Sequence, residues 1–119
     1  MTTKEIAHRL VALCREAQWE TAQRELFAEN AVSREPVPNP AFPQEVRGRD
    51  AIIAKGRQFE AMIEKLNAIT VSEPVLAEGA FSVAMGLDAV MKGEGPVKVN
   101  EICVYVVRDG KIVSEQFFV

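Results

Sequence analysis

The sequence has few of the residue types that build metal sites and redox centres. It contains one histidine and two cysteines, and Cys14 and Cys103 lie far apart without a C-x-x-C pattern. Metal sites draw on several such ligands at defined spacing, so we expect neither a metal nor another cofactor. His8 is interpreted as a surface residue. Both thiols are interpreted as reduced, which is typical of a cytoplasmic protein.

The chain also lacks a basic excess and a long apolar run. Its net charge is -3 and its pI is near 5.2, which gives no positive surface for nucleic acid or an anionic membrane. The apolar runs are too short to cross a bilayer, and the N-terminus shows no secretory signal. We therefore expect a cytoplasmic protein whose partners include neither nucleic acid nor a membrane.

The composition is that of one soluble globular domain spanning residues 1–119. Hydrophobic residues make up 48% of the chain and charged residues 26%, which argues against disorder. A chain of this length can bury a substantial core.

The most informative stretch is 97–119, in which two apolar runs flank Asp109-Gly110. This pattern predicts a β-hairpin. Both runs are apolar at odd and even positions, whereas a sheet with one face in water would alternate. We therefore expect both faces to be covered, one by the chain's own helices and the other by a second copy of the chain.

Helical spacing predicts three helices ahead of the sheet. Thr2 and Glu5 form a capping-box pattern for the first helix, and a break at 18–19 separates it from the second. Asp50 is the predicted N-cap of the third helix, whose apolar line continues to Leu66.

From Ala68 onward the apolar period changes to two, which predicts strands. The expected strands are Ala68–Ala77, Ala80–Lys92, Val97–Val107 and Lys111–Val119. Four prolines exclude helix from Pro36–Gln44, which we expect to be a stiff loop. Three helices followed by long strands predict an α+β fold, with the helices on one face of a curled sheet.

This order of elements resembles a known family. The segments LFAENAVSREP, GRDAI and VYVVRDGKIVSEQFF resemble those of SnoaL-like proteins, which belong to the superfamily of ketosteroid isomerase and nuclear transport factor two. The resemblance covers nearly the whole chain. It implies a cone-shaped barrel in which one strongly curved, mixed or antiparallel sheet wraps the three helices and leaves a pocket. It also implies a homodimer formed through the outer face of the sheet.

The resemblance assigns places to the isomerase machinery. Glu35 takes the place of the general base, Cys103 that of the protonated acid, and Val11 that of the tyrosine donor. The chain thus keeps a candidate base and lacks both standard oxyanion donors, and losing one such donor costs about a hundredfold or more in rate. The catalytic candidates are Glu35 as base, with Tyr105 and Cys103 as weak polar partners.

Two alternatives stay open for the carboxylates. Glu35 is either a pocket carboxylate or a solvated one that pairs with Arg34 or Arg47. A three-residue hairpin loop with a bulge would place Glu115 opposite Cys103, on the same face as Glu101.

A two-residue turn would instead place Ser114 and Gln116 on that face. Even in the first register, Glu101 and Glu115 could lie in water at the pocket mouth.

The expected function is binding of a small apolar molecule in the cone pocket, with proton transfer on a carbonyl compound as in an isomerase or cyclase. The alternative is a non-catalytic homodimeric module that binds a ligand or a protein. The residues expected to line the pocket are Val11, Trp19, Phe59, Met62, Met85, Leu87, Glu101, Glu115 and Phe117.

Overall fold

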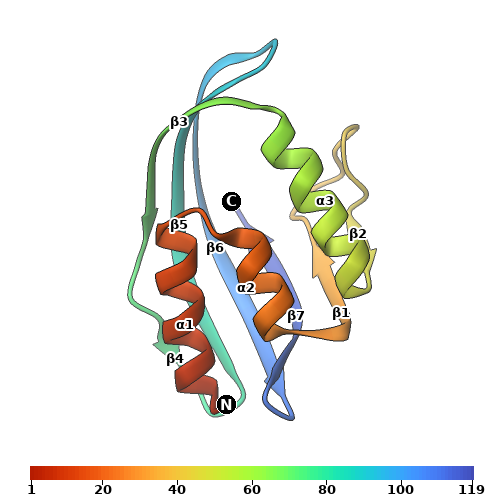
Figure 1. Cartoon of the computed structure of the whole chain (residues 1–119), viewed down its shortest axis with the longest axis vertical. Helices are drawn as coiled ribbons and strands as arrows, with labels where there is room; N and C mark the ends of the chain where they lie inside the picture. The colour runs from red at the N-terminus through yellow and green to blue at the C-terminus, as the bar shows by residue number, and fades with distance from the viewer.

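The computed structural model describes the whole chain, residues 1–119, as three helices and one seven-stranded sheet (Figure 1). The helices are α1 (Thr3–Arg15), α2 (Trp19–Leu26) and α3 (Arg49–Ala61). The strands are β1 (Phe27–Arg34), β2 (Glu45–Arg47), β3 (Ile63–Val71), β4 (Val75–Leu76), β5 (Ala80–Met91), β6 (Gly95–Arg108) and β7 (Lys111–Phe118). The α+β class predicted from the sequence is confirmed. None of the helices is long and apolar enough to cross a membrane.

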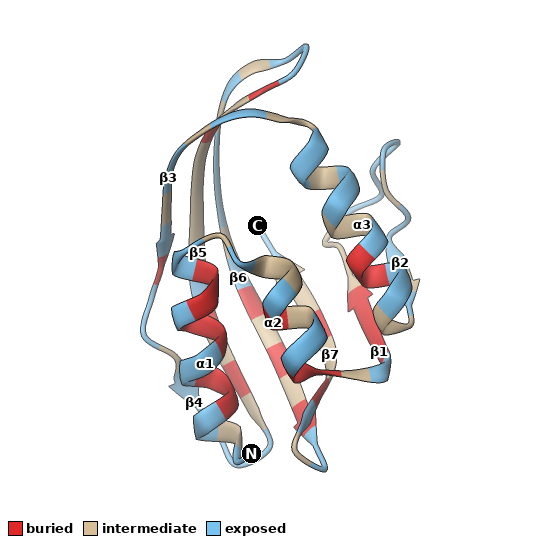
Figure 2. Cartoon of the chain, viewed as in Figure 1, coloured by how far each residue is buried: buried red, intermediate tan, exposed pale blue.

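The sheet is mixed and open. Its strand order is β2-β1-β7-β6-β5-β3, and β4 pairs with β5. Only the pairing of β1 with β7 is parallel, which ties the segment after α2 to the last strand of the chain. The three helices lie on one face of this sheet (Figure 1), and buried residues concentrate in the half that holds α1 and α2 (Figure 2). This arrangement agrees with the predicted cone.

The start of α1 follows the predicted capping box. The Glu5 amide donates to Thr2 Oγ1 at 3.1 Å, and the Thr2 amide donates to Glu5 Oε1 at 2.8 Å. The predicted break also occurs, because Ala17 adopts a positive φ of 57° and α2 begins at Trp19. His8 is exposed, as expected for a surface residue.

The third helix differs from its prediction at both ends. Its N-cap is Gly48, with φ of 96°, and Asp50 lies in the first turn instead. The helix ends at Ala61, whereas the apolar pattern extended it to Leu66. The cause lies in β3, where two register shifts against β5 place Ile63, Leu66 and Ile69 three residues apart on the half-buried face. A spacing of three in a bulged strand resembles helical periodicity.

Two shorter elements also differ from the prediction. The strand expected over Ala68–Ala77 ends at Val71, and the separate β4 begins after Pro74, which has no amide hydrogen for a sheet. The short strand β2 was not predicted. The loop over Pro36–Gln44 contains no helix, as expected. The Glu35 amide donates to Gln44 O at 2.8 Å at its base, and a bridge joins Asn39 and Phe42 within it.

The hairpin of β6 and β7 combines features of both predicted registers. Asp109 and Gly110 form a two-residue turn with φ of 51° and 74°, and they join the paired residues Arg108 and Lys111. Val106 pairs with Ser114 and Val107 with Ile112, so Val113 is an extra residue in β7.

This bulge changes which residues of β7 lie on the inner face of the sheet. Glu115 therefore lies on the inner face opposite Tyr105, and Phe117 lies opposite Cys103. The alternative with a three-residue loop, which placed Glu115 opposite Cys103, differs from the structure by one pair, although it gave the correct face for Glu115.

Candidate functional site

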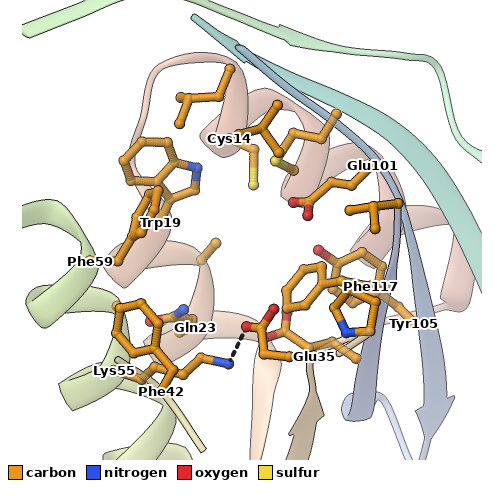
Figure 3. Close-up of a pocket in the computed structure, with 18 of the residues that line it drawn as sticks. Cys14, Trp19, Gln23, Glu35, Phe42, Lys55, Phe59, Glu101, Tyr105 and Phe117 are labelled. Carbon is orange, nitrogen blue, oxygen red and sulfur yellow. Dashed lines mark hydrogen bonds and ion pairs between the residues drawn. The ribbon is translucent and has the colours of Figure 1, made fainter. Parts of the chain in front are cut away.

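A cavity of about 420 Å³ lies between the helices and the inner face of β5, β6 and β7 (Figure 3). Fifteen of its 23 lining residues are hydrophobic. Six of the chain's eight aromatic residues line it, namely Trp19, Phe27, Phe42, Phe59, Tyr105 and Phe117. A volume of this order is typical of small-molecule sites, for which roughly 300–1,000 Å³ is usual.

Nine of the twelve residues singled out from the sequence line this cavity: Trp19, Glu35, Phe59, Met85, Leu87, Glu101, Tyr105, Glu115 and Phe117. Val11, Met62 and Cys103 do not. Val11 packs in the hydrophobic core, because the neighbouring positions Leu10 and Cys14 are those that α1 turns toward the cavity. Met62 is the C-cap of α3, and Cys103 is fully buried behind the wall.

The side chain of Lys55 organises the polar part of the cavity wall. Its Nζ donates to Glu35 Oε1 at 2.9 Å and to Ser33 Oγ at 3.0 Å, and it lies 5.6 Å from the centre of the Phe117 ring. Only 13% of the Lys55 side chain and 26% of the Glu35 side chain are exposed. A partly buried charge pair of this kind holds both groups in place. Glu35 is therefore a cavity carboxylate whose charge is already balanced (Figure 3).

Glu35 pairs with neither arginine that the sequence suggested as its partner. Arg34 and Arg47 both bind Glu45, each at 2.9 Å. The carboxylate of Glu45 in β2 thus takes up both guanidinium groups, and the lysine of α3 remains as the cation of the cavity. Because the sequence did not predict β2, it did not predict that Glu45 would bind both arginines and leave Lys55 as the partner of Glu35.

Lys55 and Ser33 were not predicted as site residues, although the sequence carries a signal for each. Lys55 lies three residues after Ile52 and four before Phe59, which places it on the inner side of α3. Ser33 lies two residues before Glu35, and alternate residues of an extended segment share a face. A lysine on an otherwise apolar helix face needs hydrogen-bond acceptors and a negative charge nearby. Glu35 provides the charge, and Ser33 provides a second acceptor.

Glu115 and Ser33 form a buried hydrogen-bonded pair. Ser33 Oγ donates to Glu115 Oε1 at 2.8 Å, and only 5% of Glu115 is exposed. Burial raises the pKa of Glu115 to about 7, although the Ser33 hydrogen bond and the charge of Lys55 both lower it. Near neutral pH this carboxyl is therefore present in both protonation states.

Glu101 extends from β6 toward the centre of the cavity (Figure 3). Burial among the apolar walls, together with the negative charge of Glu35, raises the pKa of this carboxyl to about 7. The Cys103 thiol donates a weak hydrogen bond to Glu101 Oε1 at 3.8 Å. A half-buried carboxyl that gains and loses a proton near neutral pH is suited to general acid–base chemistry.

The remaining polar groups stay neutral. Burial raises the pKa of Tyr105 and of Cys103 well above their ordinary values, and it raises the pKa of Cys14 to about 12. Neither thiol is therefore a ready nucleophile. The Tyr105 ring stacks on Phe81 at 4.9 Å, and its hydroxyl points toward the cavity near Glu101 (Figure 3). This hydroxyl is a neutral hydrogen-bond donor within reach of a bound molecule.

An open mixed sheet with three helices on one face and an apolar, carboxylate-bearing cavity between them defines a cone-shaped α+β protein. The chain belongs to the SnoaL-like family, because the model of the SnoaL-like domain matches residues 1–119. Members of this fold family are typically isomerases, cyclases or binding proteins. No match is found among curated proteins.

Solved structures share this fold. A candidate SnoaL-like polyketide cyclase from Mesorhizobium loti is 25% identical, with a TM-score of 0.92 and full coverage of both chains. A protein with a ketosteroid isomerase-like fold from Catenulispora acidiphila, in complex with trimethylamine, is 21% identical with a TM-score of 0.74, covering 100% of this chain and 87% of the other. A protein with a cystatin-like fold from Xanthomonas campestris is 17% identical with a TM-score of 0.76, covering 99% of this chain and 90% of the other.

Proposed function

We propose that the cavity binds a small, largely apolar carbonyl compound and that Glu101 transfers a proton on it. The observation that carries this proposal is the position of Glu101, which reaches into an apolar cavity with its pKa raised to about 7. Glu35, the base suggested by the resemblance, is bound to Lys55 at 2.9 Å. The base role therefore moves from Glu35 to Glu101, and Glu35 serves to hold Lys55.

The proposed reaction begins with the Glu101 carboxylate taking a proton from the carbon next to the carbonyl group. The electron pair of that C–H bond forms a carbon–carbon double bond, and the π pair of the carbonyl group moves to its oxygen, which gives an enolate that the Tyr105 hydroxyl stabilises by a hydrogen bond. Return of the proton to another carbon of a conjugated ketone gives the isomer. Attack of the enolate carbon on a second carbonyl group of the same molecule forms the ring, and the alkoxide that results takes the proton back from Glu101, which gives a cyclised hydroxyketone.

The test is proton exchange on a simple ketone. We expect the protein to accelerate deuterium incorporation into 1-phenylpropan-2-one in heavy water, followed by proton NMR. Glu101→Gln should lower the rate by about a hundredfold or more, in line with the loss of a general base. Glu64→Gln, on the exposed side of β3, is the matched control and should leave the rate unchanged. Exchange that persists in the Glu101 variant would exclude this role.

A second candidate, non-catalytic binding of an amine, is favoured by one feature of the wall. Three carboxyls and six aromatic residues line the cavity, and Lys55 is its single cation. Aromatic faces and carboxylates together bind organic cations. The Catenulispora acidiphila relative is in complex with trimethylamine, which is a small amine.

The two candidates are separated by a matched pair of ligands. Trp19, the only tryptophan, lines the cavity and reports binding by its fluorescence. An amine-binding module should bind 2-phenylethylamine about tenfold or more tightly than 2-phenylethanol, because only the amine is cationic. Equal affinities would exclude the amine-binding candidate.

A further inference from the structure

We propose that Glu115, which is held by Ser33, presents a hydrogen-bond donor to the carbonyl oxygen of the bound ligand, while Lys55 orients Ser33. This inference rests on the proposed function of the cavity and names a second donor for the enolate, beside Tyr105. It assigns the two inner carboxyls different roles. Glu101 receives the proton from carbon, and Glu115 stabilises the oxygen.

The direction of the hydrogen bonds follows from the chemistry of the three groups. A lysine ammonium can only donate, so Ser33 Oγ accepts the hydrogen bond from Lys55 Nζ at 3.0 Å. A serine hydroxyl has one hydrogen, and Ser33 directs it to Glu115 Oε1 at 2.8 Å. Lys55 and Ser33 thereby make Oε1 of Glu115 a permanent acceptor.

The proton of neutral Glu115 therefore resides on Oε2. Glu115 lines the cavity, and no side-chain oxygen or nitrogen in the chain is buried without a hydrogen-bond partner. Because Oε1 is taken up by Ser33, Oε2 is the oxygen that a ligand in the cavity can reach. The protonated carboxyl thus has one oxygen, Oε1, that Ser33 holds in place, and one oxygen, Oε2, that donates a hydrogen bond into the cavity.

The surroundings favour the neutral acid. Burial raises the pKa of Glu115 to about 7, and the negative charges of Glu35 and Glu101 raise it as well, against the lowering by Ser33 and Lys55. A fixed donor aimed at developing negative charge in an apolar cavity needs little reorganisation. This donor stands on β7, whereas the resemblance placed the protonated acid on β6 at the buried Cys103.

The test uses 3,4-dinitrophenolate, whose oxygen carries charge as an enolate oxygen does, with Trp19 fluorescence as readout. Glu115→Gln should bind within about threefold of the wild type, because Ser33 fixes the amide oxygen and turns the amide hydrogens to the cavity. Glu115→Leu should bind about tenfold or more weakly, since it has no donor. Equal binding by the leucine variant overturns the inference.

The pH dependence distinguishes an acid donor from a structural role. Glu101→Gln serves as the background, because ionisation of Glu101 would itself repel the phenolate. There the affinity should fall as the pH rises through about 7, since Glu115 loses its proton. Glu101→Gln/Glu115→Gln should show a flat profile, since an amide does not titrate. A flat profile in both variants overturns the inference.

The positioning role of Ser33 has its own comparison. Ser33→Ala should weaken phenolate binding severalfold, and Ser33→Thr, which keeps the hydroxyl, should restore it. Should the wild type exchange ketone protons while Glu115→Leu binds the phenolate unchanged, the inference fails and the proposed function stands. Should the wild type neither exchange protons of 1-phenylpropan-2-one nor bind 3,4-dinitrophenolate, both the inference and the proposed function fail.

Discussion

At the scale of single residues, the proton chemistry of the cavity depends on which of its carboxyls form an ion pair. Glu35 is neutralised by Lys55, whereas Glu101 and Glu115 are buried without a direct ion pair. The pKa of both rises to about 7 for this reason, and each keeps a different partner, Cys103 for Glu101 and Ser33 for Glu115. Two carboxyls that gain and lose protons near neutral pH give this site its capacity for acid–base chemistry.

The raised pKa of Glu115 predicts a pH-dependent stability difference. The folded protein binds this proton more tightly than the unfolded chain, whose carboxyl has the ordinary value of 4.5. The stabilisation is therefore full below about pH 4.5 and is lost as the pH rises through about 7.

Urea unfolding of the wild type and of Glu115→Gln measures this contribution. The glutamine variant should gain stability relative to the wild type between pH 5 and pH 8, by at most roughly 3 kcal/mol. A difference that does not change with pH would contradict the burial of an ionisable Glu115.

At the scale of the elements, the hairpin places the site. Val113 is the extra residue that turns Glu115 and Phe117 to the inner face, after a two-residue turn that alone would have turned them outward. The sequence predicted the hairpin and its turn, because Asp-Gly between apolar runs is a local signal. It left the register open, because a bulge in a run that is apolar on both faces leaves no trace in the pattern.

The same limit explains the other differences between prediction and structure. Two local signals gave correct predictions: the capping box at Thr2 predicted the start of α1, and the prolines after Glu35 predicted a segment without helix over Pro36–Gln44. The partner of Glu35 depends on a contact between the residue that follows β1 and Lys55 of α3, twenty residues further along the chain, and no local pattern encodes it. An ion pair between residues far apart in the sequence is set by the tertiary structure.

The turn gives a prediction for this hairpin. Gly110 has φ of 74°, a backbone region in which a Cβ is strained, so Gly110→Ala should lower the free energy of unfolding by about 1 kcal/mol. Gly79→Ala is the matched control, because this turn glycine does not have a positive φ and its Cβ would meet only Val107 O at 3.7 Å. Urea unfolding of both variants tests it. Equal effects at the two positions would contradict the turn.

At the scale of the whole molecule, the sheet has one covered and one open face. The inner face is covered by the helices and holds the cavity, whereas on the outer face Ile102 and Phe118 are each 46% exposed. Exposed apolar patches on a sheet mark interaction surfaces. We propose that this outer face pairs with a second copy of the chain, as expected from the two-sided apolar pattern of 97–119.

The proposed dimer can be tested by light scattering. The wild type should have the mass of a dimer, and Val104→Glu, in the middle of the outer face of β6, should give a monomer or an aggregate, because it would bury a charge at the interface. Thr21→Glu adds the same charge on the exposed side of α2 and should remain dimeric. A wild type that is a stable monomer would exclude this interface.

The central claim is that an apolar cavity holds carboxyls that titrate near neutral pH, and carbon-13 NMR of the glutamate side chains tests it most directly. With Glu101→Gln and Glu115→Gln used to assign their signals, both carboxyls should titrate with midpoints of about 7. Midpoints near the ordinary value of 4.5 for both groups would contradict the account, because the cavity would then be wet and its carboxylates permanently charged.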